Sequence, residues 1–288
     1  MSTPIVTGSV PVPDGKLYFE RAGQGPAIVL IHSAFLDHRE WDPQFASYAD
    51  RHTVVRYDVR GVGRSPGDRS NASDAEDLEA LLNHLELTHA FILGNSDGAR
   101  IACEFAAGMP DRVPGLILVA GGPHDLEPTE EEKARFMNTF ENGPEKQLVE
   151  LVQTGRRPEI IELSLDIWAP RVSPEQRARL RGILNDNYEH FLEFLRQDGA
   201  GGRRPSYPVA DSLRRDKVPL LSISGAHDNP ALNLWMGRFA ATVPGGHHVE
   251  IAEGDHTPSL SATAEFDRSV LDFLARIDSG QSWPPSNA

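Results

Sequence analysis

The stretch FILGNSDGARIA, residues 91–102, places two kinds of secondary structure on either side of one serine. An apolar run with strand character ends at Asn95, and apolar residues at helical spacing begin after Ser96. The pattern G-x-S-x-G at such a transition is typical of a sharp turn that exposes a nucleophilic serine. Gly94 and Gly98 remove the side chains that would collide where strand and helix come close. The stretch makes Ser96 a candidate nucleophile, with an ordinary glycine-containing turn as the alternative.

Similar apolar runs alternate with helical patterns over most of the chain. This alternation predicts an α/β fold, with a mostly parallel twisted sheet and helices on both faces. The expected strands are KLYFERA from Lys16, AIVLIH from Ala27, TVVRYDV from Thr53, HAFILGN from His89, GLILVAGG from Gly115, PLLSISG from Pro219 and HHVEIAEG from His247. The expected helices are SDAEDLEALLNHLEL from Ser73, the segment after Ser96, ALNLWMGRFAATV from Ala231 and TAEFDRSVLDFLARI from Thr263.

The alternation stops between residues 123 and 207. That segment contains the helical stretches EKARFMNTF, EKQLVELVQTG, EIIELSLDIWA and PEQRARLRGILNDNYEHFLEFLRQD, without a strand candidate. It closes at DGAGGRRPSYP, whose glycines and prolines indicate a return linker. We therefore expect a core of residues 1–122 and 208–288, with a helical subdomain of residues 123–207 inserted into it.

Composition limits the partners and the compartment. The 288 residues carry a net charge of −14, which disfavours binding to nucleic acid or to an anionic membrane surface. The one cysteine, Cys103, lies in an apolar helical stretch and is expected to be a buried structural thiol. No signal peptide or apolar run of membrane-spanning length is found, so a soluble, cytoplasmic protein is expected.

A serine nucleophile needs a base, and the base needs an orienting acid. His256 and Asp228 each follow an apolar run, at the strand ends where Ser96 also lies, and the chain order Ser, Asp, His fits this class of sheet. Asp125, just after another run, is the alternative acid, whereas Asp255 is expected to be a loop residue.

The negative oxygen that forms during acyl transfer needs two backbone N–H donors. One is expected from Asp97, directly after the nucleophile. The other is expected from Ala34 in the loop HSAFLDHREW, with Phe35 as the next choice. The Asp97 carboxylate is expected to turn away from this oxyanion hole and to pair with Arg100. A rival interpretation has that carboxylate face the pocket and hold a substrate ammonium group.

These motifs together resemble the α/β-hydrolase superfamily almost from end to end. Residues 32–41 fit the H-G-x7-W spacing of that family, and residues 58–65 fit its D-x-R-G-x-G-x-S turn. The resemblance implies a serine hydrolase with Ser96, Asp228 and His256 as its triad, and a helical lid formed by residues 123–207. It implies no metal or organic cofactor.

Two residues depart from the family pattern. Ser33 stands where the glycine after the histidine is usual, and Ala99 stands where a second glycine after Gly98 is frequent. Both departures concern the local shape of the oxyanion region rather than the fold.

The residue types separate the branches of the superfamily. Epoxide hydrolases and haloalkane dehalogenases have an aspartate at the position of Ser96. The sequence GNS resembles carbon–carbon bond hydrolases, but their glycine- and proline-rich oxyanion loop is missing from HSAFLDHREW.

The stretches HSAFLDHREWDPQ and GNSDGARIA are similar to serine-dependent macrolide esterases. This resemblance implies opening of a bulky or cyclic ester such as a macrolide lactone, and hence antibiotic inactivation. The alternatives are a generic small-ester carboxylesterase or lactonase, a carbon–carbon bond hydrolase, and a non-catalytic ligand-binding homologue.

The expected lid offers a bulky apolar lining for the substrate. The negative charge of the chain would also attract the cation of an amino sugar. The alternatives are that these side chains form the lid's own core and that the charge serves solubility. The candidate lining residues are Phe136, Phe140, Trp168, Tyr188 and Phe191.

Overall fold

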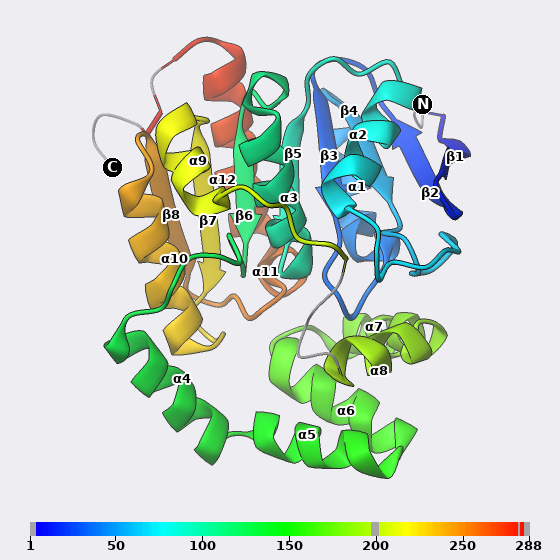
Figure 1. Cartoon of the computed structure of the whole chain (residues 1–288), viewed down its shortest axis with the longest axis vertical. Helices are drawn as coiled ribbons and strands as arrows, with labels where there is room; N and C mark the ends of the chain where they lie inside the picture. The colour runs from blue at the N-terminus through cyan, green and yellow to red at the C-terminus, as the bar shows by residue number, and fades with distance from the viewer. Residues whose placement is uncertain (1–3, 197–201, 282, 285–288) are drawn as a thin grey trace.

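An eight-stranded sheet forms the centre of the molecule (Figure 1). The computed structural model describes residues 4–196, 202–281 and 283–284. The strand order is β1-β2-β4-β3-β5-β6-β7-β8. The strands are β1 (Val6–Val12), β2 (Gly15–Ala22), β3 (Ala27–Ile31), β4 (Thr53–Tyr57), β5 (Phe91–Asn95), β6 (Leu116–Val119), β7 (Leu220–Gly225) and β8 (Gly246–Ile251).

The sheet is parallel from β4 to β8, and β1 and β2 are antiparallel at one edge. The predicted α/β fold with a mostly parallel sheet is therefore confirmed. Strand β1 was not expected from the sequence, because most of its residues are solvent-exposed and it carries no apolar run. It forms by pairing with β2, from Val6 opposite Arg21 to Val12 opposite Gly15.

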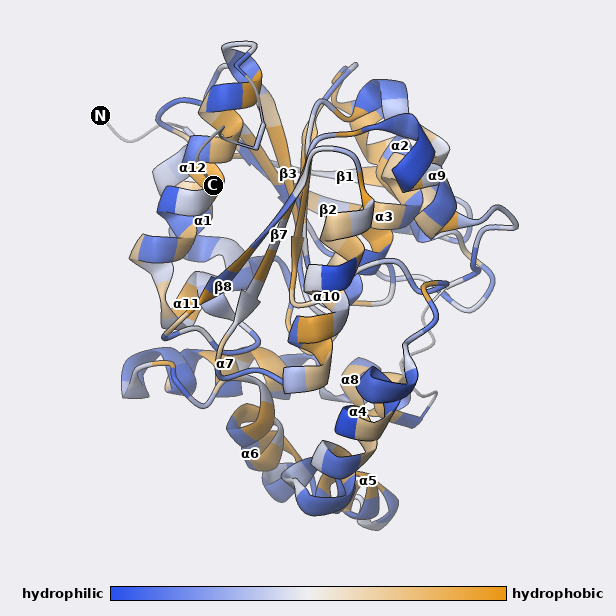
Figure 2. Ribbon diagram, turned by 90° about the vertical axis from the view of Figure 1, so that its left-hand side faces the viewer, coloured by the Kyte–Doolittle hydropathy of each residue, from blue (hydrophilic) through white to orange (hydrophobic). Residues whose placement is uncertain are grey.

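Helices cover both faces of the sheet, as Figure 2 shows along the sheet edge. One apolar cluster packs α2, α3, α9 and α10 on one face, and a second packs α1 and α12 on the other. Cys103 of α3 is fully buried in the first cluster, which confirms its expected structural role. These helices are α1 (Asp42–Tyr48), α2 (Asp74–His84), α3 (Asp97–Gly108), α9 (Val209–Asp216), α10 (Pro230–Thr242) and α12 (Thr263–Asp278), with the short α11 (Pro258–Ser261) after β8.

Five helices lie between β6 and α9 in the described part of the chain. They are α4 (Glu130–Asn142), α5 (Pro144–Thr154), α6 (Arg157–Trp168), α7 (Pro174–Asp186) and α8 (Tyr188–Arg196). No strand occurs among the described residues of 123–207. The stretch expected as one helix from Pro174 is broken at Asn187, which ends α7. Residues 197–201 of the expected linker lie outside the described residues.

Helices α5 to α8 share an apolar core with the loop after β3 and with the short α11, at the carboxyl ends of the parallel strands. Phe35 and Leu36 follow β3, Leu260 follows β8, and all three belong to this cluster. Helices α5 to α8 therefore lie beside the strand ends, and Figure 1 shows α4 and α5 forming an arc below the sheet.

Polar contacts attach the five-helix segment to the core at two places. The Asn187 amide donates to Asp37 Oδ2 at 2.8 Å and accepts from Gly63 N at 2.9 Å. On the opposite side, Arg238 of α10 donates to Glu132 of α4 at 2.8 Å. No helix among the described residues is long and apolar enough to cross a lipid bilayer.

Candidate active site

Ser96 occupies a strained turn between β5 and α3. Its φ of 56° and ψ of −113° lie outside the regions that most residues adopt. A Cβ on Gly94 would lie 2.1 Å from the Gly98 carbonyl oxygen, and one on Gly98 would lie 2.4 Å from the Ile31 carbonyl oxygen. The two glycines are thus required by the close approach of strand and helix, as the sequence predicts.

Asp228 and His256 form a hydrogen-bonded pair at the same end of the sheet. His256 Nδ1 donates to Asp228 Oδ2 at 2.8 Å, and both side chains are buried. Burial alone would lower the pKa of His256, but the carboxylates of Asp228, Asp255 and Glu40 outweigh it and raise that pKa above 6.5. Because Nδ1 carries the proton shared with Asp228, the other ring nitrogen is left to act as a base.

Asp125 was the alternative to Asp228 as the acid that orients His256, but in the structure it has a different role. Its carboxylate accepts from Val209 N at 2.7 Å and from Ala210 N at 3.0 Å, so it caps the first turn of α9. Asp255 accepts from Thr257 N at 2.9 Å and from Arg171 N at 2.9 Å, as a loop-stabilising residue would.

Ala34 lies in the loop after β3 and Asp97 begins α3, and both are candidate oxyanion donors from the sequence. Among the described residues, neither Ala34 N nor Asp97 N donates to a protein acceptor, so both N–H groups remain candidate oxyanion donors. His32 fixes the start of the loop, because its Nδ1 lies 2.8 Å from the Ser33 carbonyl oxygen and its Nε2 accepts from Val59 N at 3.0 Å. His32 therefore links the start of this loop to Ser33 and to Val59, which follows β4.

The Asp97 carboxylate is engaged by two cations. Arg100 Nε donates to it at 2.6 Å, which confirms the predicted pair, and Arg69 Nη2 donates at 2.6 Å to its other oxygen. Burial would raise the pKa of Asp97, but the two guanidinium groups hold it well below 3.8. Both arginines also bind the buried Asp74. The Asp97 side chain therefore belongs to a buried ionic network. Ser96 does not need this carboxylate as a base, because His256 is the candidate base.

A cavity of about 600 Å³ lies between the five-helix segment and the core, and Asp228 and His256 are in its wall. Phe136, Phe140 and Trp168 line it, in agreement with the expectation from the sequence. The other described lining residues are mainly apolar, and Ser96 is not among them. The cavity therefore reaches the candidate active site at Asp228 and His256.

Tyr188 and Phe191 do not line this cavity, so the expectation for these two residues was wrong. Phe191 is 0% exposed, and both belong to the core that α5 to α8 share. Trp168 connects that core to the site: its ring centroid lies 5.8 Å from that of Phe191, 5.5 Å from Phe35 and 6.5 Å from His256.

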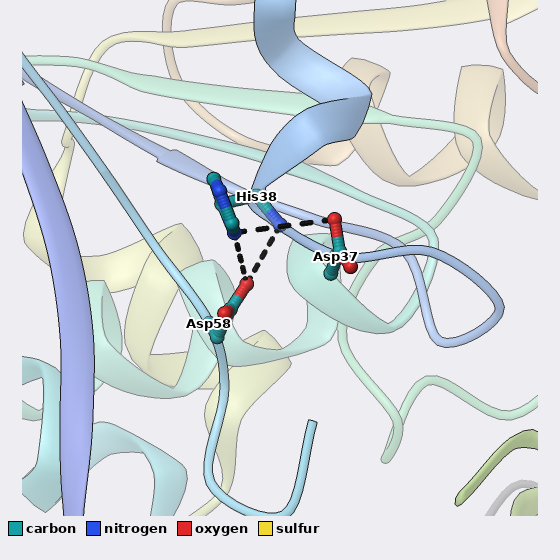
Figure 3. Close-up of side chains that lie close together, drawn as sticks. All are labelled: Asp37, His38 and Asp58. Carbon is teal, nitrogen blue, oxygen red and sulfur yellow. Dashed lines mark hydrogen bonds and ion pairs between the residues drawn. The ribbon is translucent and has the colours of Figure 1, made fainter. Parts of the chain in front are cut away.

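Asp37, His38 and Asp58 are close enough together to resemble a metal site (Figure 3). Their polar atoms are already occupied. Asp58 Oδ1 accepts from His38 Nδ1 at 2.6 Å and from His38 N at 2.9 Å, and its other oxygen accepts from Arg64 N at 2.8 Å. Asp37 accepts from Arg39 and from Asn187, between α7 and α8. The cluster cross-links the loops after β3 and β4, which gives the D-x-R-G-x-G-x-S motif a structural role.

Two residues at the site were missed in the sequence. Glu40 is fully buried and accepts from Ser33 N, and Arg69 donates to Asp97, 28 positions further along the chain. The sequence offers only a weak local signal for Glu40, an acidic residue directly before Trp41.

Comparisons with known proteins agree with this geometry. The profile of the alpha/beta hydrolase family matches residues 28–268. The chain belongs to the alpha/beta hydrolase family.

It is 35% identical over 269 residues to a putative carbamate hydrolase, RutD, from Azorhizobium caulinodans, which covers 92% of this chain and 97% of that one. It is 25% identical to 3-oxoadipate enol-lactonase 2 from Acinetobacter baylyi, over 92% of this chain and 95% of that one.

Solved structures show the same fold. The enol-lactonase from Burkholderia xenovorans LB400 superimposes with a TM-score of 0.71 at 22% identity, over 93% of this chain and all of that one. A thermophilic esterase from Thermogutta terrifontis gives 0.74 at 24% identity, over 95% and 99%.

Proposed function

We propose that the chain is a serine hydrolase that cleaves carboxylic ester bonds through an acyl-enzyme. The observation that carries this proposal is the 2.8 Å bond between His256 Nδ1 and Asp228 Oδ2, at the sheet end where Ser96 occupies its strained turn. Family membership and the named hydrolase relatives support a hydrolase-type function.

The reaction follows from these groups. His256 takes the proton of Ser96 Oγ as that oxygen attacks the ester carbonyl carbon. The carbonyl oxygen becomes negative and accepts from the N–H groups of Asp97 and Ala34, which together supply several kcal/mol. His256 then protonates the leaving alkoxide, and water repeats the sequence on the acyl-enzyme to release the acid.

The proposed substrate is a bulky or cyclic ester, because the cavity is large and mainly apolar. A volume of about 600 Å³ suits a drug-sized molecule. A macrolide lactone is the narrower proposal, supported by the resemblance of the oxyanion loop and the nucleophile turn. Ring opening would give a product heavier by one water, with no separate alcohol released.

A carbamate is the second candidate. The relative that is 35% identical over nearly its full length is named a putative carbamate hydrolase. Attack of Ser96 on a carbamate carbonyl would use the same base and the same oxyanion donors.

The test is a screen by mass spectrometry of macrocyclic lactones, small lactones, aryl esters and carbamates, with Ser96→Ala as control. Turnover of a macrolide with a gain of one water by the wild type alone would support the narrow proposal. Turnover of aryl esters or small lactones alone would leave a generic esterase or lactonase. A chain that turns over nothing and reacts with no serine-directed reagent would be a non-catalytic homologue.

A further inference from the structure

Glu40 is a buried acid between the two halves of the candidate oxyanion hole. It is 0% exposed, and it forms no ion pair with a lysine or arginine among the described residues. Its Oε2 accepts from Ser33 N at 2.7 Å and from Ser33 Oγ at 2.9 Å, and its Oε1 accepts from Asn95 Nδ2 at 2.6 Å. Three donors from two separate segments thus converge on one carboxyl group.

Both partners of Glu40 are direct neighbours of reacting groups. Ser33 precedes Ala34, whose N–H is one expected oxyanion donor, and Asn95 precedes Ser96. Ser33 and Asn95 are each 0% exposed, so water cannot replace Glu40 as their hydrogen-bond partner. Glu40 therefore bridges the loop after β3 and the turn at Ser96.

Burial of a carboxyl group without a cationic partner is unfavourable, and burial raises the pKa of Glu40. The three hydrogen bonds offset this cost. Because burial of the Glu40 carboxyl group is unfavourable, packing alone does not explain its presence. The positioning of Ser33 and Asn95 explains it better. The departure at Ser33 fits the same arrangement, because a glycine there would lack the hydroxyl that gives Glu40 its third donor.

We infer that Glu40 is a positioning residue that fixes the Ala34 N–H relative to Ser96 and the Asp97 N–H. This inference rests on the proposed serine-hydrolase function and assigns to that reaction a residue outside the triad. Glu40 acts through Ser33 and Asn95, so its loss should misalign the donors in the transition state and leave binding of the uncharged ester nearly unchanged.

The test compares Glu40→Gln with Asp267→Asn. Asp267 is a matched control, because its carboxylate also accepts from two side chains, Tyr48 at 2.8 Å and Gln44 at 3.1 Å, between α12 and α1. Steady-state kinetics would use 4-nitrophenyl butyrate. The rate at which an alkyl fluorophosphonate labels Ser96 would be followed by intact mass, because this reagent needs the same oxyanion donors. Thermal unfolding would be recorded for every variant.

For Glu40→Gln we expect kcat to fall by about 30-fold or more, with KM within about threefold, and labelling to slow by a similar factor. Asp267→Asn should change both quantities by less than about threefold. Ser33→Gly keeps the backbone donor and should lose less than Glu40→Gln. In a double-mutant cycle, the two changes should be less than additive because they share one hydrogen bond.

Two outcomes would overturn the inference. One is a kcat of Glu40→Gln within threefold of the wild type. The other is an equal loss in Glu40→Gln and Asp267→Asn that follows their loss of thermal stability, which would make Glu40 structural only. A wild-type chain that neither hydrolyses the ester nor is labelled would instead overturn the proposed function, and the inference with it.

Discussion

Asp97 Oδ2 lies 2.6 Å from Arg69 Nη2, so a loop 28 residues away in the chain supplies a cation to the residue directly after the candidate nucleophile. With Arg100 on its other oxygen, the Asp97 carboxylate has a positive partner on each side. A carboxylate turned toward the oxyanion instead would cost about 3 kcal/mol at 5 Å and an effective dielectric constant of 20, as much as one donor contributes. The network thus keeps a negative charge near Ser96 without cancelling the oxyanion hole.

Asp97→Asn should weaken the fold more than the catalysis. The change leaves the buried Arg69 and Arg100 with less negative charge, so we expect the free energy of unfolding to fall by about 3 kcal/mol. The backbone N–H remains, so kcat/KM should fall by less than about tenfold for cationic and neutral esters alike. Urea unfolding and a matched pair of esters would measure both. Loss confined to the cationic ester would favour the rival interpretation, in which Asp97 binds a substrate ammonium group.

Ser96→Ala and His256→Ala should each reduce ester hydrolysis by at least about 1,000-fold without unfolding the protein, because the triad acts as a unit. Asp228→Asn should be nearly as severe, since the imidazole loses its orienting acid. Initial rates and circular dichroism would provide the measurements.

Asp125→Asn is the control for the acid. It should cost about 1 kcal/mol of stability through the cap of α9 and leave kcat/KM within about threefold of the wild type. If Asp125→Asn abolished activity and Asp228→Asn did not, the assignment of the acid would be reversed.

The value of kcat/KM should fall as the pH drops through the pKa of His256, which lies above 6.5, because only the neutral imidazole accepts the serine proton. The carboxylates that raise the pKa of His256 are Asp228, which is hydrogen-bonded to the ring, and Asp255 and Glu40. In Asp228→Asn the ring loses the nearest of these, so the acid limb should move to lower pH as the plateau falls. A pH profile of both proteins would show it, and an unmoved limb would mean that another group titrates.

Substitution of Trp168 should affect substrate binding, whereas substitution of Phe191 should affect the stability of the fold. Trp168→Ala removes a ring that lines the cavity beside His256, so KM for a bulky ester should rise by about tenfold while kcat for a small ester stays within about threefold. Phe191→Ala empties a fully buried site and should cost about 3–5 kcal/mol of stability. Equal effects of both variants on KM would contradict this division.

The parts of this site that could be predicted from sequence are those set by local pattern. Ser96, Asp228 and His256 each follow an apolar run, and parallel strands bring such positions to one sheet edge. The strained turn at Ser96 could also be predicted from local sequence, because Gly94 and Gly98 flank it.

The parts that could not be predicted depend on contacts between distant segments. Strand β1 exists through its pairing with β2, and Arg69 meets Asp97 only after the sheet has formed. Tyr188 and Phe191 have the same helical spacing whether they face a cavity or a core. Only the packing of α8 against its neighbours decides between these two positions.

The burial of Cys103 has a practical consequence for following the five-helix segment in solution. The only thiol of the chain is inaccessible, and burial raises its pKa well above 9.0, so thiol reagents should leave the wild type unmodified. A cysteine introduced at Met137 on α4 or Val149 on α5, which are 50% and 53% exposed, would then carry a fluorophore or spin label alone. Labelled in this way, the arc of α4 and α5 that lines the cavity becomes directly observable in solution.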